Sequence, residues 1–345
     1  MDRKKINVGG VVIGGGAPVS VQSMTNTKTE DAKATIEQIK VLQAAGCDIV
    51  RVAVPNMEAA KAIGEIKENI SIPLVADIHF DYRLAVESAA AGADKIRINP
   101  GNIGDKSKVK AVVDACRARN LPIRIGVNGG SLEKNLLEKY GVSAEAMLQS
   151  ALGHVKILNE LDFDDICISV KASDVKLTVE AYKLLHERTD YPLHLGVTEA
   201  GTEYMGIIKS AAGIGSLLLD GIGDTIRVSL TAPPEKEVTA GIAILKAVGV
   251  RQGGVKMVSC PSCGRCRIDL IGLAGEVEKR LEGCKKDITV AVMGCAVNGP
   301  GEAREADFGV AGGVGEGLLF KKGEIIGKAP MNELADRLMS LIDEA

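Results

Sequence analysis

Two copies of one pattern decide the fold of this chain: "AAGCDIVRVAVPN" at residues 44–56 and "AAGADKIRINPGN" at residues 90–102. Each copy opens with the end of a helical pattern and passes through a glycine, which can adopt the left-handed conformation that terminates helices. An aspartate and then a β-rich run follow in both copies. A repeated unit of helix, glycine and strand predicts helices alternating with parallel strands.

Working outward from this repeat, the sequence contains eight β-rich runs with amphipathic helical patterns between them. The runs are "VSVQSM" (19–24), "IVRVAV" (49–54), "PLVADI" (73–78), "KIRIN" (95–99), "PIRIGV" (122–127), "ICISV" (166–170), "LHLGV" (193–197) and "TIRVSL" (225–230). Eight strand–helix units in roughly 230 residues match the size of a (β/α)8 TIM-type barrel. The alternative is an open doubly wound sheet, which the lack of a typical GxGxxG turn disfavours.

The alternation stops around "GVRQGG" at residues 249–254. The remaining sequence predicts a strand, a cysteine cluster, a helix, a second strand, a glycine-rich stretch and a last helix. We therefore expect an α/β protein with two domains. A TIM-type barrel spans residues 1–250, and a smaller α+β domain spans residues 251–345.

Composition limits the partners of this chain. Its 345 residues are 46% hydrophobic, and its formal net charge is −3. The acidic balance argues against nucleic acid as a partner, because phosphate binding needs a basic surface. The sequence contains no run of 18 or more apolar residues, so we expect no membrane-spanning helix. The charged, glycine-rich start does not resemble a signal peptide, so we expect a cytoplasmic protein.

Basic residues recur at the ends of the predicted strands, where barrel active sites lie. Residues two apart share a face of a strand, so these side chains are expected to converge on the barrel mouth. Burying several like charges is costly without an anion, and guanidinium groups suit phosphate oxygens. The sequence thus predicts a pocket for a small phosphate-bearing molecule, most simply a diphosphate. The predicted substrate-binding residues are Arg51, Arg97, Asn99, Arg124, Asn128, Lys171, Arg227 and Ser229.

We call the five basic residues among them, Arg51, Arg97, Arg124, Lys171 and Arg227, the basic crown. The alternative is that each one pairs with a nearby carboxylate in a structural network. The strand ends also carry Asp77, His79 and Glu199. These three are candidates for moving a proton or binding a hydroxyl group, unless the acids merely pair with the crown.

Cysteines mark the second domain. Cys260, Cys263 and Cys266 lie within seven residues, and Cys295 follows in "GCAVNGPGE". Outside this run the chain has no further C-x2-C and no H-x3-H, so the spacing favours an iron–sulfur cluster over zinc, which stays the alternative. Radical S-adenosylmethionine enzymes carry C-x3-C-x2-C early in the barrel, unlike this chain. Glu302, seven residues after Cys295, is a candidate carboxylate ligand or else a solvated loop acid.

Several motifs together resemble the 4-hydroxy-3-methylbut-2-enyl diphosphate synthase family, iron–sulfur enzymes of the methylerythritol phosphate route to isoprenoids. The motifs are "VQSMTNT" (21–27), "ADIHFDYRLA" (76–85), "KIRINPGN" (95–102), "IRIGVNGGSL" (123–132), "SVKAS" (169–173), "LGVTEAG" (195–201), "SCPSCGR" (259–265) and "GCAVNGPGEA" (294–303). They cover nearly the whole chain. The form resembled is the short, two-domain bacterial one.

This resemblance implies an oxidoreductase that uses two electrons to open and dehydroxylate 2-C-methyl-D-erythritol 2,4-cyclodiphosphate. It implies that the basic crown with Asn128 and Ser229 holds the diphosphate, near Asp77, His79 and Glu199. It further implies flavodoxin or ferredoxin as the electron donor and a head-to-tail homodimer. A 4Fe-4S cluster would be bound by Cys260, Cys263, Cys295 and Glu302.

One feature departs from the family. Cys266 is an additional cysteine, and we expect it to be a bystander rather than a ligand. A competing hypothesis is a barrel transferase for a phosphate-bearing ligand, with a purely structural zinc domain.

Overall fold

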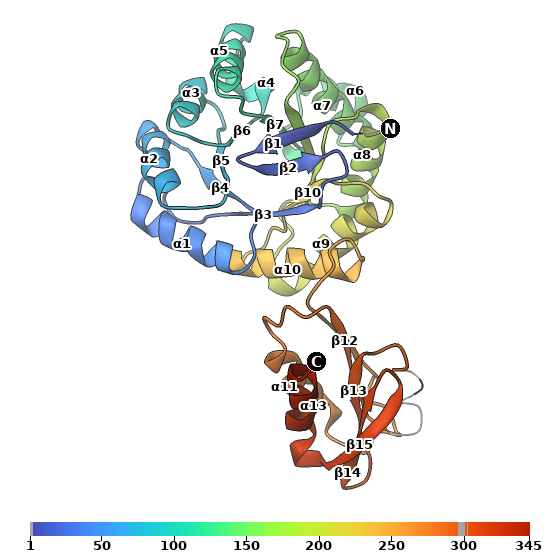
Figure 1. Ribbon diagram of the computed structural model, residues 1–345. Helices are drawn as coiled ribbons and strands as arrows, with labels where there is room; N and C mark the ends of the chain where they lie inside the picture. Colours follow the sequence, from blue (N-terminus) through green and yellow to red (C-terminus); the bar gives the residue numbers. More distant parts are fainter. Residues whose placement is uncertain (1–2, 296–300, 302) are drawn as a thin grey trace. The chain divides into compact units, whose positions relative to one another are not determined.

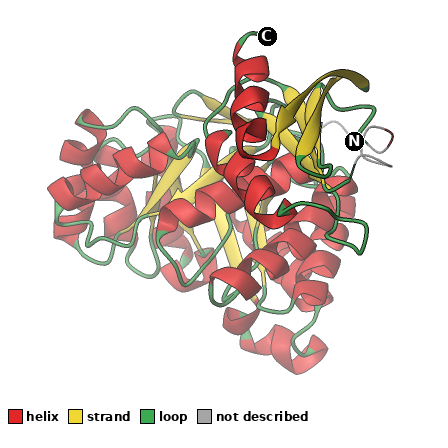
Figure 2. Cartoon of the chain, turned by 90° about the horizontal axis from the view of Figure 1, so that it is seen from below, coloured by secondary structure: helices red, strands yellow, loops and turns green. Residues whose placement is uncertain are grey.

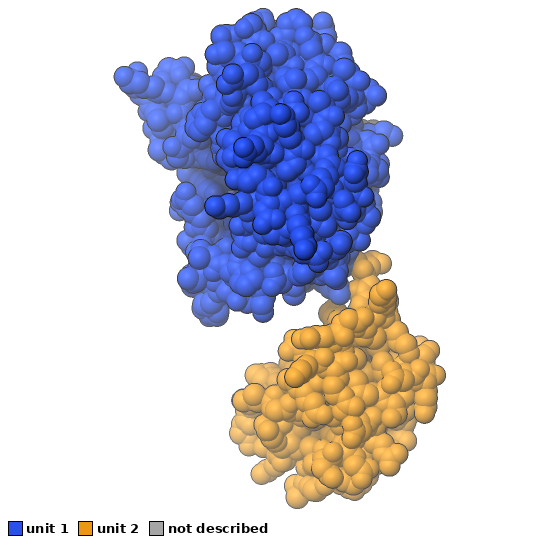
Figure 3. Space-filling view, turned by 90° about the vertical axis from the view of Figure 1, so that its left-hand side faces the viewer, with its two compact units in different colours: residues 1–251 blue, residues 252–345 orange. Residues whose placement is uncertain are grey.

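The computed structural model describes residues 3–295, 301 and 303–345 (Figure 1). The chain divides into two compact units, Met1–Arg251 and Gln252–Ala345, which are coloured separately in Figure 3. Among the described residues, no helix is both long and apolar enough to cross a membrane.

The first unit is a parallel barrel. Within residues 3–251, all of them described, one sheet contains eight strands in the order β8-β7-β6-β5-β4-β3-β10-β9. A bridge between Ile168 and Leu193 joins β8 to β9 and closes the circle. The predicted TIM-type barrel is therefore confirmed. The strands are β3 (Ser20–Met24), β4 (Ile49–Ala53), β5 (Leu74–Asp77), β6 (Lys95–Ile98), β7 (Ile123–Asn128), β8 (Ile166–Lys171), β9 (His194–Leu195) and β10 (Thr225–Ile226).

Helices cover the outside of this sheet, as the cartoon in Figure 2 shows. Most begin at an Asp, Asn or Ser whose side chain accepts a backbone N–H of the first turn, which satisfies part of the unpaired helix end. The helices are α1 (Ala32–Ala44), α2 (Met57–Glu68), α3 (Tyr82–Ala90), α4 (Pro100–Ile103), α5 (Lys106–Arg117), α6 (Lys134–Tyr140), α7 (Ala144–Asn159), α8 (Val175–Arg188), α9 (Glu203–Leu219) and α10 (Pro234–Ala247).

The sequence repeat has a structural reason. Gly46 and Gly92, which follow α1 and α3, have φ angles of 95° and 100°, a region that favours glycine. The aspartates after them fasten neighbouring strands together. Asp48 accepts a backbone N–H from β3, and Asp94 accepts one from β5, both at 2.7 Å. Each copy therefore ends a helix and ties the coming strand to its neighbour.

A hairpin that the sequence analysis did not predict closes one end of the barrel. Strands β1 (Lys5–Val8) and β2 (Val11–Gly14) pair antiparallel. Their buried side chains form one apolar cluster with residues at the starts of barrel strands: Ile6, Val8, Ile13, Ile49, Val75 and Cys167. Because the amino-terminal end is plugged in this way, the carboxyl end of the barrel is the open one.

The second unit is an α+β fold. Its described residues form a five-stranded sheet in the order β11-β12-β13-β14-β15. The first three strands are parallel and the last two are antiparallel additions. Helices α11 (Leu270–Arg280) and α13 (Leu334–Asp343) pack on it around an apolar core. The strands are β11 (Val255–Ser259), β12 (Ile288–Met293), β13 (Phe308–Ala311), β14 (Glu316–Lys321) and β15 (Glu324–Pro330).

Candidate active site

The side chains that point into the barrel are mostly polar, although bulky branched residues usually fill this position. On β7 the isoleucines and the valine belong to the core beneath the helices, so Arg124, Gly126 and Asn128 face inward. The same alternation turns Ser169 and Lys171 of β8 inward. The spacing of the polar residues along each strand therefore determines which of them can meet at the mouth.

A cavity of about 140 Å³ occupies the carboxyl end of the barrel. It brings together the whole basic crown, seven of the eight predicted substrate-binding residues, and both Asp77 and His79. The residues that line it are Arg51, Asp77, His79, Arg97, Arg124, Asn128, Ser169, Lys171, Thr198, Arg227 and Ser229. Five basic side chains and one carboxylate make this a strongly positive pocket, suited to an anion.

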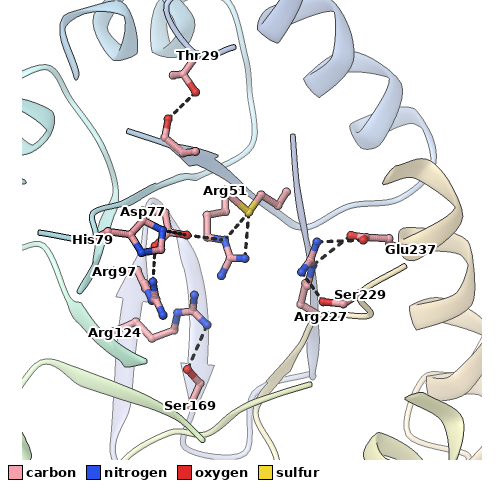
Figure 4. A network of polar contacts seen from close by, with 12 residues as sticks. Thr29, Arg51, Asp77, His79, Arg97, Arg124, Ser169, Arg227, Ser229 and Glu237 are labelled. Atoms are coloured by element: carbon pink, nitrogen blue, oxygen red, sulfur yellow. Dashed lines mark hydrogen bonds and ion pairs between the residues drawn. The ribbon is translucent and has the colours of Figure 1, made fainter. Parts of the chain in front are cut away.

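Asp77 is the carboxylate at the centre of one half of the cavity (Figure 4). Its Oδ1 accepts a hydrogen bond from Nη1 of Arg97 at 2.9 Å, and its Oδ2 lies 3.6 Å from Nε of Arg51. Nε2 of His79 lies 3.9 Å from the same Oδ2. Burial would raise the pKa of the Asp77 carboxyl, but the neighbouring guanidinium groups of Arg51 and Arg97 hold it at about 2. Asp77 is therefore ionised and fixes two arginines.

Arg124 and Lys171 have no such counter-charge. Arg124 is 1% exposed, and its only hydrogen bond within the described residues runs from Nη1 to the Ser169 hydroxyl at 3.4 Å. Burial, reinforced by Arg97, lowers the pKa of Arg124 to about 10. Burial and the surrounding arginines also lower the pKa of Lys171 well below its ordinary value. These two groups give the pocket its uncompensated charge.

Two inward-facing glycines give the crown room to lie across the barrel. A Cβ atom at Gly126 would lie 2.5 Å from Nε of Arg97, and one at Gly196 would lie 2.6 Å from Nζ of Lys171. Both distances are too short for a real contact. Any side chain at these positions would displace the arginine or the lysine from the mouth.

Glu237 of α10 is a residue that the sequence analysis missed. It is buried and reaches past β10 to bind Arg227, with Nε–Oε2 and Nη2–Oε1 distances of 3.1 and 3.0 Å. Arg227 also donates through Nη1 to the Ser229 hydroxyl (Figure 4). A signal was present: Glu237 falls among Pro234 and Val238 on the face of α10 that is otherwise apolar and buried. A lone acid on such a face needs a partner inside.

Two predicted residues lie elsewhere. Asn99 is the N-cap of α4, where its Oδ1 accepts the N–H of Gly101 at 3.1 Å, and it is not among the residues lining the cavity. Glu199 is exposed after β9, with a φ of 51° that is unusual for a residue other than glycine. It too is not among the lining residues, and its predicted role stays a prediction.

Further buried polar groups lie on the inner face of the barrel strands. Lys95 and His194 are fully buried, and within the described residues neither side chain has a hydrogen-bond partner. Burial lowers the pKa of Lys95 to about 8 and that of His194 well below its ordinary value. At neutral pH His194 is therefore uncharged, and it is not a direct part of the cavity lining.

A larger hollow of about 430 Å³ lies on the outside of the barrel, between α9 and α10. Seven of its ten lining residues are alanine, isoleucine or valine, and the others are Thr239 and the ion pair of Glu203 and Lys236 at 3.6 Å. It has no convergent polar groups that could carry out chemistry. We therefore place the candidate active site in the smaller, charged cavity.

In the second unit, two cysteines follow the carboxyl ends of two neighbouring strands. Cys260 follows β11 and Cys295 lies two residues after the end of β12, and these neighbouring strands are parallel. The backbone N–H of Gly294 donates to Sγ of Cys260 at 3.2 Å. The N–H of Arg265, together with its side chain, lowers the pKa of the exposed Cys263 thiol. Such N–H donors favour thiolates, the form in which cysteine binds metals.

Cys266 is turned differently. Its Sγ donates to the backbone carbonyl of Ile268 at 3.3 Å, and it packs against the apolar core of the second unit. Within the described ranges, no three cysteine, histidine or acidic side chains are grouped closely enough to hold a metal ion. Glu302 lies outside the described residues. The fourth predicted cluster ligand therefore stays a prediction.

The fold and the site define a class. The chain is a TIM-type barrel with an anion-binding mouth, followed by an α+β unit that carries a cysteine cluster. Solved structures of Yersinia pestis dihydropteroate synthase resemble the barrel, with TM-scores of 0.51 and 0.52 at 13 and 14% sequence identity. They cover 71% of this chain and 97 and 98% of those chains, and they support the fold alone.

Family models identify the chain more closely. The GcpE TIM-barrel domain matches residues 3–242, and the GcpE protein C-terminal domain matches residues 256–344. The chain therefore belongs to the GcpE family. A relative from Geobacter sulfurreducens is 62% identical over 342 residues, covering 99% of this chain and 97% of the relative. One from Clostridium perfringens is 60% identical, covering 99% and 98%. Both are 4-hydroxy-3-methylbut-2-en-1-yl diphosphate synthases (flavodoxin).

Proposed function

We propose that this chain is a 4-hydroxy-3-methylbut-2-enyl diphosphate synthase of isoprenoid precursor biosynthesis. It converts 2-C-methyl-D-erythritol 2,4-cyclodiphosphate into 4-hydroxy-3-methylbut-2-enyl diphosphate and water, consuming two electrons and two protons. The observation that carries the proposal is a cavity with five basic residues and one carboxylate, in a chain 62% identical to such a synthase over nearly its full length.

The basic crown is proposed to bind the diphosphate of the substrate. Asn128 and Ser229 lie among the crown residues and add neutral hydrogen-bonding groups. Arg124 and Lys171 gain most from an anion, because they are buried without a counter-charge. Binding energy gained on the diphosphate can hold the carbon skeleton in place for the reaction.

Asp77 and His79 are proposed to lie near the carbon skeleton and its hydroxyl groups. The pKa of Asp77 is about 2, so this carboxylate accepts hydrogen bonds and is a poor proton donor at neutral pH. The exposed side chain of His79 is the better placed of the two to exchange protons with solvent. Glu199 is the remaining candidate acid and lies on the segment after β9.

The spacing of the cysteines along the chain, and the N–H donors at two of them, support an iron–sulfur cluster. Cys260, Cys263 and Cys295 would hold it with Glu302, and backbone N–H groups already point at the Cys260 and Cys263 sulfurs. Such N–H groups stabilise thiolate charge and tune the cluster. A 4Fe-4S cluster bound there would supply the two electrons one at a time and a Lewis-acidic iron. Cys266 is committed to a backbone carbonyl and is not needed as a ligand.

Electrons are proposed to come from flavodoxin, as the relatives' names state, or from ferredoxin. A homodimer is proposed from the family resemblance. Light scattering of the purified holoenzyme at several concentrations would test that assembly, and a monomer throughout would refute it.

Anaerobic purification followed by iron, sulfide and zinc analysis tests the chemistry. About four irons and four sulfides per chain, with turnover of the cyclodiphosphate by a reduced flavodoxin, support the synthase. One zinc and no sulfide after anaerobic reconstitution, with no turnover, would favour the transferase with a structural zinc domain.

A further inference from the structure

Arg227 is held more tightly than any other member of the basic crown. Glu237 meets its guanidinium in the fork-to-fork geometry, at 3.1 and 3.0 Å, while Ser229 accepts from the remaining nitrogen. Such bidentate pairs combine charge with a fixed orientation. Arg51, by contrast, donates to the sulfur of Met24, a weak acceptor, and lies 3.6 Å from Asp77.

Two further hydrogen bonds fix Glu237 itself. Its Oε1 accepts the backbone N–H of Leu230 at 3.0 Å, and its Oε2 accepts the hydroxyl of Ser23 at 3.2 Å. These contacts come from the segment after β10 and from β3, while the side chain starts on α10. Glu237 is 3% exposed, so its carboxylate is shielded from solvent. Its hydrogen bonds to Leu230 and Ser23 hold it in one orientation.

The pairing leaves a defined set of free donors. A guanidinium has five N–H bonds. In Arg227 two point at Glu237 and one at Ser229. The other two, one on each terminal nitrogen, remain for a ligand in the cavity that Arg227 lines. The carboxylate thus aims a pair of donors instead of leaving a rotating cation.

Glu237 also limits the charge of the pocket. Within the described part of the chain, Asp77 pairs with Arg51 and Arg97, Glu237 pairs with Arg227, and the other two crown residues have no carboxylate partner. Counted as formal charges, five basic and two acidic side chains give +3 around the cavity, so a bound cyclic diphosphate dianion leaves the site at about +1. Loss of Glu237 would raise it by one.

We propose that Glu237 is the positioning and selectivity residue of this site. It aims Arg227 at the substrate diphosphate and lowers the affinity of the pocket for more highly charged anions such as inorganic pyrophosphate. This inference rests on the proposed function for its substrate. The effect of the Glu237 charge on anion affinity, however, can be measured by pyrophosphate binding without turnover.

The test compares Glu237→Gln, Glu237→Asp and the matched control Glu235→Gln as full-length, cluster-reconstituted proteins. Glu235 is partly exposed on the same first turn of α10, so its substitution removes the same formal charge away from the cavity. Calorimetry measures the Kd for inorganic pyrophosphate, and anaerobic kinetics measure kcat and KM for the cyclodiphosphate. Unfolding midpoints accompany both measurements.

Glu237→Gln is expected to bind pyrophosphate about fivefold more tightly, because one negative charge is removed from a buried site. Its kcat/KM is expected to fall about 10- to 100-fold, because the Arg227 guanidinium is no longer held in one orientation. Glu237→Asp keeps the negative charge and shortens the side chain by one methylene group. It should therefore leave the pyrophosphate Kd within about twofold and lower kcat/KM about tenfold. Glu235→Gln should behave as the wild type.

Tighter pyrophosphate binding together with a lower kcat/KM distinguishes this role from a general structural defect, which would weaken both binding and catalysis. If Glu237→Gln weakens pyrophosphate binding in proportion to kcat/KM, or if Glu237→Asp keeps wild-type kcat/KM, the inference is overturned. If the reconstituted wild type does not turn over the cyclodiphosphate, the proposed function fails. The pyrophosphate comparison then still decides the charge role of Glu237.

Discussion

Replacing Arg124 by methionine should make the ligand-free protein more stable and a diphosphate ligand bind worse. Arg124 is the most deeply buried member of the basic crown and has no carboxylate partner among the described residues. Methionine keeps much of the aliphatic volume and removes the charge. The two expected effects have opposite signs, which makes the substitution informative.

The expected change in the free energy of unfolding follows from the burial of the Arg124 charge. Lowering the pKa of Arg124 from 12.5 to about 10 corresponds to about 3 kcal/mol against the charged side chain in the folded state. Because the depressed pKa belongs to the folded state, that penalty is fully present at pH 7. Loss of the hydrogen bond to Ser169 returns about 1 kcal/mol. The net gain in the free energy of unfolding is about 2 kcal/mol.

Binding should change in the other direction. Arg124 has unpaired N–H groups on Nε and Nη2 within the cavity lining. Two charge-assisted hydrogen bonds to a diphosphate contribute about 3 kcal/mol or more together. The Kd for pyrophosphate and the KM for the cyclodiphosphate should therefore rise about 100-fold.

Urea unfolding with and without pyrophosphate, and calorimetry, measure both quantities. Arg119→Met, at an exposed arginine of the same segment, is the matched control and should change neither. A less stable variant with unchanged pyrophosphate affinity would refute the reasoning. Arg124 would then belong to a structural ion network, as the alternative hypothesis for the crown supposes.

Three further perturbations test neighbouring parts of the molecule. The pKa of Lys95 is about 8 when folded and near 10.5 when unfolded, so the unfolded chain holds more protons between these pH values and stability rises through that window. Lys95→Met should flatten the rise in urea midpoint between pH 8 and 10; equal slopes in variant and wild type would contradict this. The Asp77 carboxylate, with a pKa of about 2, stabilises the fold above about pH 4 and loses this effect as the pH falls toward 2. Asp77→Asn should cost about 3 kcal/mol at pH 7 by leaving two arginines unpaired, and pyrophosphate should recover part of it; an unchanged midpoint would rule out the pairing. Cys266→Ser should keep about four irons per chain while Cys263→Ser loses the cluster; loss of iron from both would make Cys266 a ligand.

Much of the architecture was predictable because short stretches of the sequence encode it. In both copies of the repeat, a glycine follows the helix and an aspartate precedes the next strand, and the hydrogen bonds of Asp48 and Asp94 show what the pattern does. Strand alternation has a period of two, so the inward position of Arg124, Asn128 and Lys171 followed from spacing alone. The hairpin β1–β2 was missed because its short strands are stabilised by the barrel end that they cover.

The partners of the charged groups could not be predicted in the same way. The sequence offered Asp77 and Glu199 as equivalent acids, yet Asp77 lies between two arginines and Glu199 is exposed. Asn99 has the spacing of a site residue, and in the structure its side chain caps a helix, so its predicted role in substrate binding stays a prediction. Such choices depend on side-chain direction at the strand end, where regular alternation no longer applies.

The barrel, the inward ring of basic residues and the cysteine spacing follow from the amino-acid sequence, since each rests on a short-range periodicity or a local motif. The ion pairs of Asp77 with Arg51 and Arg97, and of Glu237 on α10 with Arg227, emerge from the folded chain alone. Those pairings depend on how strands are staggered around the barrel and how α10 packs against β3 and β10. Both are long-range properties, which no local pattern in the chain encodes.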